Sequence, residues 1–361
     1  MYNGTRVLDV HSHIRPPRAA YLYLTSLLAS NYATSSPIGG GRHADQPGMR
    51  DEEFKAAADS HAKYLDERNI DVQILSPHPI EIHGWMEPHV FKSWISFTND
   101  MIFKTVQAHP DRWVGCGQLP QRNEEPDSSH CLPELERIAS EYAFPAITLS
   151  PDITGRGGTP GMDEHYWDPV YERCEELGIV VIVHGTDNMD PRFRSIPRSF
   201  QFAFQPEQWI SMMLLRHGDQ FKRFPGLKVI VCHCGGALDR HIGDYPWLAK
   251  EKDVSNNLFY DTCSYDLDFL AAAIKQRGIP QMCFGVEAPG GGSNMRPGTD
   301  LTADDMVPMF ADHPTLSFLT EQDKVDIMTN NPARVVPGLA TPVETNAKAK
   351  VAAYEKPAVT A

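Results

Sequence analysis

The sequence lacks several features that would assign it to common classes of protein. No apolar stretch approaches the roughly 20 residues that a membrane-spanning helix needs, and the first residues, MYNGTRVLDV, lack the positive leader and apolar core of a secretory signal. There is no long basic run and the net charge is −14, so we expect neither nucleic acid nor a membrane as a partner. We therefore expect a cytoplasmic protein that acts on a small molecule.

Cysteine is scarce, and its pattern argues against a disulfide framework. The seven cysteines are odd in number and several lie in apolar runs, which is typical of reduced, buried thiols. Cys232 and Cys234 form C-x-C rather than a C-x-x-C redox pair, so we interpret them as packing residues. The chain also lacks a glycine-rich nucleotide-binding turn after its first apolar run, and Gly290–Gly292 fit no G-x-x-x-x-G-K pattern.

Short apolar runs recur along the chain, and most segments between them have the composition of helices. Continuous apolar runs suit parallel strands that are buried on both faces. Eight such runs alternating with helices are the pattern of a single (β/α)8 TIM barrel, an α/β fold, with a doubly wound sheet as the alternative. The predicted strands are Arg6–Val10, Asp71–Ser76, Trp113–Leu119, Ala146–Ser150, Ile179–Val183, Lys228–Cys232, Leu258–Thr262 and Met282–Val286.

Two regions depart from this alternation. Residues 15–50 contain a segment rich in Ser, Gly and Pro, and we predict that they form an insertion after the first strand, over the barrel mouth. The segment after Gly338 is rich in Ala, Thr and Lys, and we predict an extended C-terminal tail that is mobile or wraps a neighbour. The expected organisation is one barrel domain over residues 1–338 and a tail over residues 339–361.

Side chains that can bind metal or move protons follow six of the eight predicted strands. Active sites of TIM barrels lie at the C-terminal ends of the strands, so these side chains are expected to converge. His11 and His13 alternate along an extended segment and therefore face the same side. The six groups are His11 with His13, then His78 with Glu81 and His83, then His184, His233, Asp261 and Glu287.

A metal centre is the simplest chemistry for this set. Several imidazoles with one carboxylate suit Zn²⁺ or another borderline divalent ion. We predict one divalent metal held by His11, His13, His184 and Glu287, with zinc as the expected ion and Mn²⁺ or Fe²⁺ as alternatives. His233 is then free to act as general acid or base on water activated by the metal, and Glu287 is a second catalytic candidate.

The segments that carry these residues resemble the amidohydrolase superfamily, within it the branch of aminocarboxymuconate semialdehyde decarboxylase. The resemblance rests on DVHSH, YWDPVYERCEELGIVVIVHG, FPGLKVIVCHCGGAL, FYDT and NNPARV. It implies metal binding by His11, His13 and His184, and an acid/base role for His233. It also implies a homodimer as the common assembly, although a hetero-oligomer with a related subunit stays open.

Two positions distinguish this chain from the decarboxylases of that branch. Those enzymes usually carry Asp where this chain has Glu287, which is similar instead to 4-oxalomesaconate hydratase and the lignin meta-cleavage product hydrolase. They also tend to have Arg where this chain has His78. The fourth predicted strand, AITLS, lacks the lysine that bridges two metals in binuclear amidohydrolases, so a single metal is expected.

Further polar residues are candidates for contacts to substrate. A substrate carboxylate could be bound by arginine side chains in the segment DPRFRS after the fifth strand, or by a histidine near the metal. Asp261 could hold His233, and an aspartate after His184 could orient that ring. The substrate-binding candidates are His78, Arg192, Arg194 and Asp187.

We predict a metal-dependent hydrolase or lyase for a small carboxylated, aromatic-derived keto or dienol acid. The reaction would be C–C bond hydrolysis or hydration by metal-activated water. One alternative is a non-oxidative decarboxylase of the same branch. Another is a binuclear iron or manganese barrel that activates dioxygen, with His78, Glu81 and His233 at the second metal. The last is a metal-binding, non-catalytic subunit of a hetero-complex.

Overall fold

A ring of eight parallel strands forms the centre of the molecule. The computed structural model describes residues 1–30, 50–186, 188–196, 202–239 and 254–350. Each strand pairs with the next one in chain order, so the predicted (β/α)8 barrel is confirmed, and every predicted run contains one observed strand. The strands are β1 (Leu8–Asp9), β2 (Val72–Leu75), β3 (Trp113–Gln118), β4 (Ala146–Leu149), β5 (Val180–Val183), β6 (Val229–Val231), β7 (Leu258–Asp261) and β8 (Met282–Cys283).

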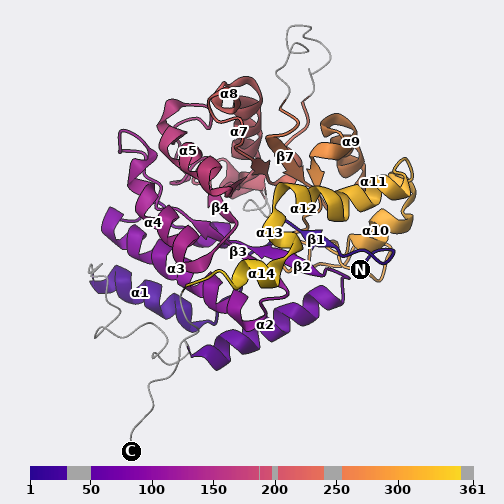
Figure 1. The fold of residues 1–361 in the computed structure, drawn as a ribbon, viewed down its shortest axis with the longest axis horizontal. Coiled ribbons are helices and arrows are strands. Elements are labelled where there is room, and N and C mark those ends of the chain that lie inside the picture. The colour runs from indigo at the N-terminus through magenta and orange to yellow at the C-terminus, as the bar shows by residue number, and fades with distance from the viewer. Residues whose placement is uncertain (31–49, 187, 197–201, 240–253, 351–361) are drawn as a thin grey trace, which may run out of the picture.

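Helices surround the strands on the outside (Figure 1). They lie between consecutive strands, as the βα alternation requires, and several follow β8. The α-helices of the described residues are α1 (Ala19–Ser30), α2 (Asp51–Asp66), α3 (Pro88–Ala108), α4 (Leu132–Arg137), α5 (Asp168–Leu177), α7 (Gln205–His217), α8 (Gln220–Arg223), α9 (Leu267–Arg277), α10 (Val307–Asp312), α11 (Glu321–Val325), α12 (Asn331–Val335), α13 (Pro337–Ala340) and α14 (Pro342–Asn346).

Main-chain hydrogen bonds beyond the two short strands β1 and β8 close the ring. The N–H of Val10 donates to the carbonyl of Phe284 at 2.9 Å, and the N–H of Glu287 donates to the carbonyl of His11 at 2.9 Å. The closure therefore runs past the strand ends and into the segments that carry candidate site residues.

Alternate residues of each strand pack into two different cores. On β5, Val180 and Ile182 lie in the interior of the barrel, whereas Val181 and Val183 belong to the larger core beneath the helices. A period of two is what a pleated strand imposes, and burial of both faces explains why each run is continuously apolar. All seven cysteines are buried and free, which confirms the prediction of packing thiols.

The helices after β8 close the N-terminal end of the barrel. Val335, Val336 and Leu339 belong to the same core cluster as the interior strand residues, and Figure 1 shows α12, α13 and α14 across this end. Asn346 donates from Nδ2 to the carbonyls of Pro110 and Trp113, both at 2.8 Å. The predicted tail boundary at Gly338 therefore does not mark the end of the fold, because residues up to Asn346 pack on the barrel; residues 351–361 lie outside the described chain.

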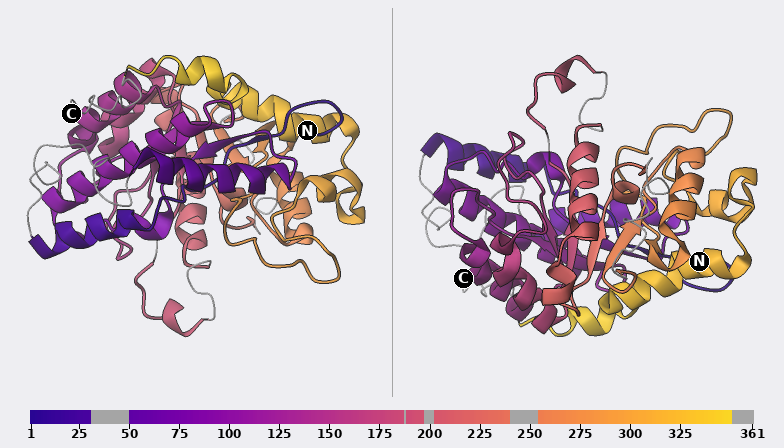
Figure 2. Two further views of the ribbon diagram at one scale, coloured as in Figure 1. Left: turned by 90° about the horizontal axis from the view of Figure 1, so that it is seen from below. Right: turned by 90° about the horizontal axis from the view of Figure 1, so that it is seen from above.

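The predicted insertion after β1 contains α1, and residues 31–49 lie outside the described chain. Helix α1 packs on α3 through Tyr23, whose ring centroid is 4.2 Å from that of Phe97. Figure 2 shows residues around Phe193–Ser195 projecting from the side of the barrel opposite to α12–α14. Among the described residues, every helix is too short or too polar to cross a membrane.

A buried histidine on α2 joins this helix to the barrel. His61 is 3% exposed, and its Nε2 lies 3.0 Å from Oε1 of Gln73 on β2. Burial lowers the pKa of His61 to about 4, so the ring stays neutral in the folded protein at neutral pH.

We expect the buried His61 to make the fold less stable in mild acid. The unfolded chain takes up a proton on His61 below pH of about 6.5, but the folded chain does so only near pH 4. The contribution of His61 to the free energy of unfolding is fully present above pH 6.5. It falls with the pH, by about 2 kcal/mol between pH 7 and pH 5. In urea unfolding, the free energy of unfolding of His61→Gln should fall less over this interval than that of the wild type. The control His89→Gln, at an exposed site on α3, should lose as much as the wild type. Equal losses in all three proteins would contradict the assignment.

Candidate metal centre

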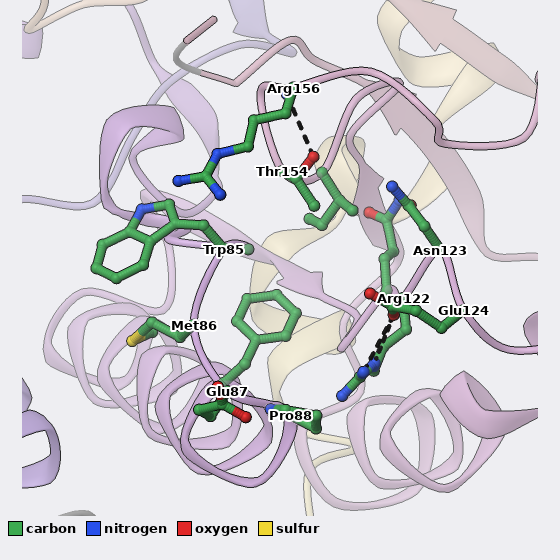
Figure 3. Close-up of a pocket in the computed structure, with 13 residues that line it drawn as sticks. Trp85, Met86, Glu87, Pro88, Arg122, Asn123, Glu124, Thr154 and Arg156 are labelled. Atoms are coloured by element: carbon green, nitrogen blue, oxygen red, sulfur yellow. Dashed lines mark hydrogen bonds and ion pairs between the residues drawn. The ribbon is translucent and has the colours of Figure 1, made fainter.

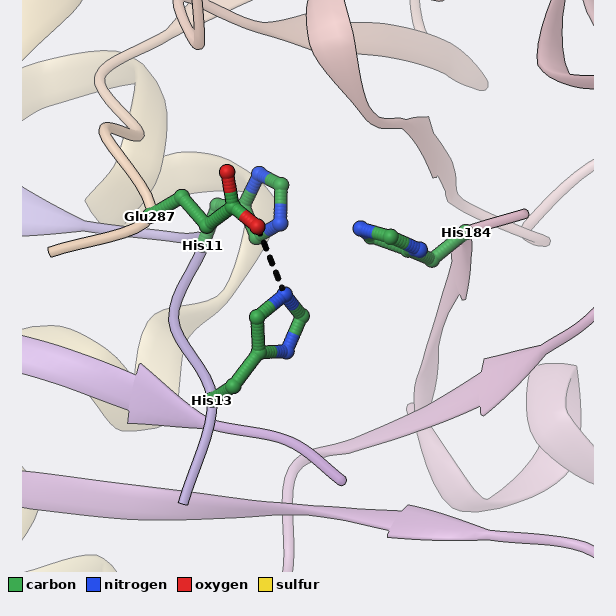
Figure 4. A group of neighbouring side chains, drawn as sticks. All are labelled: His11, His13, His184 and Glu287. Carbon is green, nitrogen blue, oxygen red and sulfur yellow. Dashed lines mark ion pairs between the residues drawn. The ribbon is translucent and has the colours of Figure 1, made fainter. Parts of the chain in front are cut away.

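Four side chains from distant parts of the chain meet at the C-terminal end of the barrel (Figure 4). His11 and His13 follow β1, His184 follows β5 directly, and Glu287 follows β8. One ligand atom from each lies within 4.8 Å of the others. The structure thus brings together the four residues that the sequence analysis selected as ligands of one metal.

Each of the three imidazoles is oriented through its Nδ1 atom. The partner oxygens come from a side chain at the end of β7, a side chain beside β2 and a main-chain carbonyl after β5. The pairs are His11 with Oδ2 of Asp261 at 2.7 Å, His13 with Oγ of Ser76 at 2.9 Å, and His184 with the carbonyl of Gly185 at 2.6 Å. A carboxylate or carbonyl can only accept, so it fixes the proton on Nδ1 of His11 and His184 and leaves a lone pair on Nε2.

The Nε2 atoms of His11, His13 and His184 are buried and make no hydrogen bond to any described residue. Oε1 of Glu287 lies 3.4 Å from Nε2 of His13. Buried polar atoms without partners cost free energy, and three lone pairs converging beside a carboxylate are the arrangement that a divalent cation needs. The residues present therefore fit a metal ion.

The charge states of this cluster also suit a cation. Burial lowers the pKa of His184 well below its ordinary value, and the neighbouring imidazoles add to this effect. Burial lowers the pKa of His13 too. Burial acts to raise the pKa of Glu287, but His13 and His233 outweigh it, so the pKa lies well below the usual range. Neutral imidazoles and an ionised carboxylate are the forms that bind metals.

His233 lies beside the four residues. Its ring centroid is 5.0 Å from those of His11 and of His184, and its Nε2 is 3.7 Å from Oε2 of Glu287. Its Nδ1 lies about 3 Å from the side-chain amide of Gln208 on α7. Burial lowers the pKa of His233, but Glu287 outweighs this and raises it overall, so the ring can hold a proton next to the carboxylate.

Asp261 orients a different histidine from the one predicted. Its Oδ1 accepts the N–H groups of Cys234 and Cys263, each at 3.0 Å. The remaining oxygen faces His11, and Gln208 holds His233 instead. The prediction that Asp261 holds His233 was wrong because the carboxylate is fully engaged by the chain ends after β6 and β7 and by His11.

Sequence reasoning missed a second buried carboxylate, Asp9. It accepts the N–H of His11 at 2.9 Å and the N–H of Val286 at 3.3 Å, and Nε2 of Gln73 donates to it at 2.8 Å. Asp9 therefore connects the two segments that carry His11 and Glu287. Its position two residues before the H-x-H pair was a signal in the sequence, whereas nothing in the sequence marked Gln208, which lies on a helix 25 residues before His233.

The geometry gives no support to a second metal at His78, Glu81 and His233. The ring of His78 lies 5.3 Å from that of His13, and burial lowers its pKa to about 3, so it is a neutral neighbour of the cluster. Every metal-sized group of ligand atoms among the described residues includes His11, and none includes His78 or Glu81. Glu81 lies in a short 3₁₀ turn whose main chain accepts a hydrogen bond from Trp94.

The other substrate-binding candidates lie in the loop after β5. The side chain of Arg192 is 87% exposed and is paired with Asp190, so this structure gives it no contact with the metal cluster. Arg194 lies in the projecting turn Phe193–Ser195, and Asp187 lies outside the described residues.

The chain is similar to proteins of one known family. Residues 8–338 match the profile of the Amidohydrolase family. A 2-keto-4-carboxy-3-hexenedioate hydratase from Sphingobium sp. (strain NBRC 103272 / SYK-6) is 29% identical over 310 residues, which cover 81% of this chain and 86% of that protein. A 2-amino-3-carboxymuconate-6-semialdehyde decarboxylase from Dictyostelium discoideum is 26% identical over 65% of each chain. The crystal structure of 4-oxalomesaconate hydratase from Rhodopseudomonas palustris is 26% identical, with a TM-score of 0.75 over 95% of this chain and 99% of that one.

We expect Asp261→Asn to weaken zinc binding by about ten- to a hundredfold. An asparagine can still accept the two main-chain N–H groups, but its amide would then point a donor at Nδ1 of His11. The ring would have to move its proton to Nε2, which removes a lone pair from the site. Competition with a chromophoric chelator measures the affinity.

Asp268→Asn is the matched control, because Asp268 is an exposed aspartate in the first turn of α9. Unchanged zinc affinity in Asp261→Asn would show that His11 is not a ligand of the bound ion. The same titration gives the stoichiometry, for which we expect one ion per chain, and two ions per chain would favour the binuclear alternative.

Proposed function

Because this chain belongs to the amidohydrolase family, we propose that it is a metal-dependent enzyme that adds water to a small, conjugated keto or enol acid with carboxylate groups. Its relatives include a hydratase over most of the chain and a decarboxylase over a shorter part. The observation that carries the proposal is the pair formed by Glu287 and His233 beside the three imidazoles. A base and an acid at one centre are what the addition of water to a C=C bond requires.

The roles of the residues follow from their positions. His11, His13, His184 and Glu287 would hold the ion, which when bound supplies a positive charge that lowers the pKa of water and polarises a substrate oxygen. The ionised Glu287 can accept a proton from the attacking water. His233, held by Gln208 and carrying a proton, can donate it to the carbon next to the one that receives the hydroxyl. After the addition, the proton on Glu287 can return to His233, whose Nε2 lies 3.7 Å from Oε2 of Glu287. This transfer restores the starting protonation state of both residues.

Zinc is the proposed ion, since three imidazole nitrogens and one carboxylate oxygen suit it best, and Mn²⁺ or Fe²⁺ are the alternatives. The proposed ligand is a small carboxylate, with neither nucleic acid nor membrane as a partner. We further propose a cytoplasmic homodimer, supported by the composition and by the family resemblance. A hetero-oligomer with a related subunit is the alternative assembly.

A decarboxylase is the second candidate function, because the relative from Dictyostelium discoideum carries that name. In that reaction His233 would supply a proton to the carbon that loses CO₂, and no water would be added. The carboxylate of Glu287 favours water addition, since it offers a base close to His233 that decarboxylation does not use.

The zinc-loaded protein should hydrate 2-keto-4-carboxy-3-hexenedioate, the compound in the name of the Sphingobium relative. We expect the absorbance of the conjugated system to fall without release of CO₂, and mass spectrometry in ¹⁸O-labelled water should find one solvent oxygen in the product. Release of CO₂ without a hydrated product would overturn hydration in favour of decarboxylation.

Replacing His233 should strongly lower turnover and leave metal binding intact. We expect His233→Asn to lower kcat by about 10²–10⁴-fold, the usual contribution of a general acid or base. Asparagine suits this site because the backbone there has φ +53°, which asparagine tolerates. His89→Gln is the control and should keep full activity. A His233→Asn variant with normal turnover would contradict the assignment. If only a complex with a related subunit is active, unchanged turnover of that complex with His233→Asn would favour a non-catalytic subunit.

A further inference from the structure

A cavity lies on the same face of the barrel as the candidate metal centre, formed by the segments after β2, β3 and β4 (Figure 3). Its volume is about 340 Å³, enough for a small organic acid. The lining residues include Trp85, Arg122, Asn123 and Arg156, and none of the four candidate metal ligands. The proposed function leaves this cavity without a role.

Close main-chain contacts and hydrogen bonds hold the walls of the cavity in place. A Cβ atom on Gly84 would lie 2.1 Å from the carbonyl oxygen of Ile153, so only glycine allows the β2 and β4 segments to approach this closely. Asp152 accepts the N–H of Gly157 at 2.7 Å. These contacts make the cavity a preformed feature, which lowers the entropic cost of binding a ligand.

The β4 segment is also bonded to the segment that follows His184. Oγ1 of Thr186 donates to the carbonyl of Asp152 at 2.5 Å, and the N–H of Met189 donates to the carbonyl of Gly155 at 2.6 Å. The cavity therefore neighbours the proposed metal centre without sharing its ligands.

Two cationic side chains line this cavity, and one of them has no anionic partner among the residues that the structure describes. Arg122 pairs with Glu124 at 3.0 Å. Arg156 is exposed and makes no ion pair with any described residue. In Figure 3 its guanidinium extends toward the side of the cavity where the indole of Trp85 lies. A guanidinium with free donors is suited to bind a carboxylate through two parallel hydrogen bonds.

The cavity also offers a flat apolar surface. Trp85 lines it and remains 49% exposed, which is a high value for so large an apolar side chain. A planar conjugated group placed against the indole would remove this surface from water and gain stacking. Asn123 accepts a hydrogen bond from Thr159 through its amide oxygen, and its amide nitrogen can donate to a ligand.

We propose that the cavity lined by Trp85 and Arg156 is a separate binding site for a planar, conjugated monocarboxylate. Arg156 binds the carboxylate, and the indole of Trp85 stacks on the conjugated plane. The carboxylates of Glu87 and Glu124 also line the cavity, and they disfavour a second negative charge, so a monoanion fits better than a dianion or phosphate. The site needs no metal, and it therefore goes beyond the proposed function.

Benzoate binding to metal-free protein tests this proposal. Isothermal titration of chelator-treated protein should detect benzoate, whereas benzamide, which has the same shape without the charge, should bind at least about tenfold more weakly. Cyclohexanecarboxylate, which has the charge without the plane, should also bind more weakly than benzoate. Inorganic phosphate should not compete.

Arg156→Gln should weaken benzoate about tenfold and leave benzamide unchanged, and Trp85→Leu should remove the preference for benzoate over cyclohexanecarboxylate. Arg173→Gln, at a partly exposed arginine on α5 that pairs with Glu136, is the control and should bind benzoate normally. No benzoate binding, equal binding of benzamide, or benzoate affinity untouched by Arg156→Gln would each overturn the proposal. Because these measurements use metal-free protein, they stand apart from any failure of the hydration assay.

Discussion

The closure of the barrel between its first and last strands is the constraint on which the candidate site depends. Strands β1 and β8 have only two residues each, so the ring is closed largely by hydrogen bonds beyond them. Glu287 donates its N–H to the carbonyl of His11, and Asp9 accepts N–H groups from both segments. The same bonds that complete the fold thus bring a carboxylate from residue 287 next to imidazoles from residues 11 and 13.

The backbone is unusual at the two residues to which we assign proton transfer. His233 has φ +53° and Glu287 has φ +55°, in the left-handed region that residues other than glycine rarely adopt. Such conformations persist where surrounding contacts enforce them, and they are found often at functional sites. Here the contacts come from Asp261 and Gln208 around His233 and from the β1–β8 closure around Glu287, so the fold holds both side chains toward one point.

The burial of the imidazoles explains how an acidic chain can hold a site of this kind. Burial keeps His13 and His184 in their neutral form, and the oxygen that faces each Nδ1 atom sets the direction of the ring. The net charge of −14 belongs to the whole chain, whereas the charges beside the cluster are the ionised carboxylates of Asp261 and Glu287. Burial raises the pKa of Asp9 to about 8, so this carboxyl group is largely uncharged at neutral pH. The cavity at Trp85 and Arg156 has a different balance, because two arginines and two glutamates line it together.

Much of the fold and the core of the candidate site could be predicted from the sequence. Continuous apolar runs such as Ile179–Val183 identify buried parallel strands, because this pattern depends only on neighbouring residues. The residues after each strand are candidates for the site, because a barrel directs the C-terminal ends of its strands to one face. His11, His13, His184 and Glu287 could be chosen as ligands in this way, and the structure brings them within metal-binding distance of one another. The C-terminal boundary of the barrel could not be predicted, because a composition rich in Ala and Thr does not reveal that Leu339 packs against the barrel interior.

The positions of the strands, the residues that stand at their ends and the type of metal chemistry these residues allow could all be inferred from the order of amino acids. Which partner orients each ring depends on how the folded segments meet. Asp261 holds His11 rather than His233, Gln208 reaches His233 from a helix, and Gly84 lets two segments form the cavity at Trp85 and Arg156. The physical reason is that strand periodicity is a property of neighbouring residues, whereas contacts between segments depend on register, helix rotation and the packing of the whole barrel.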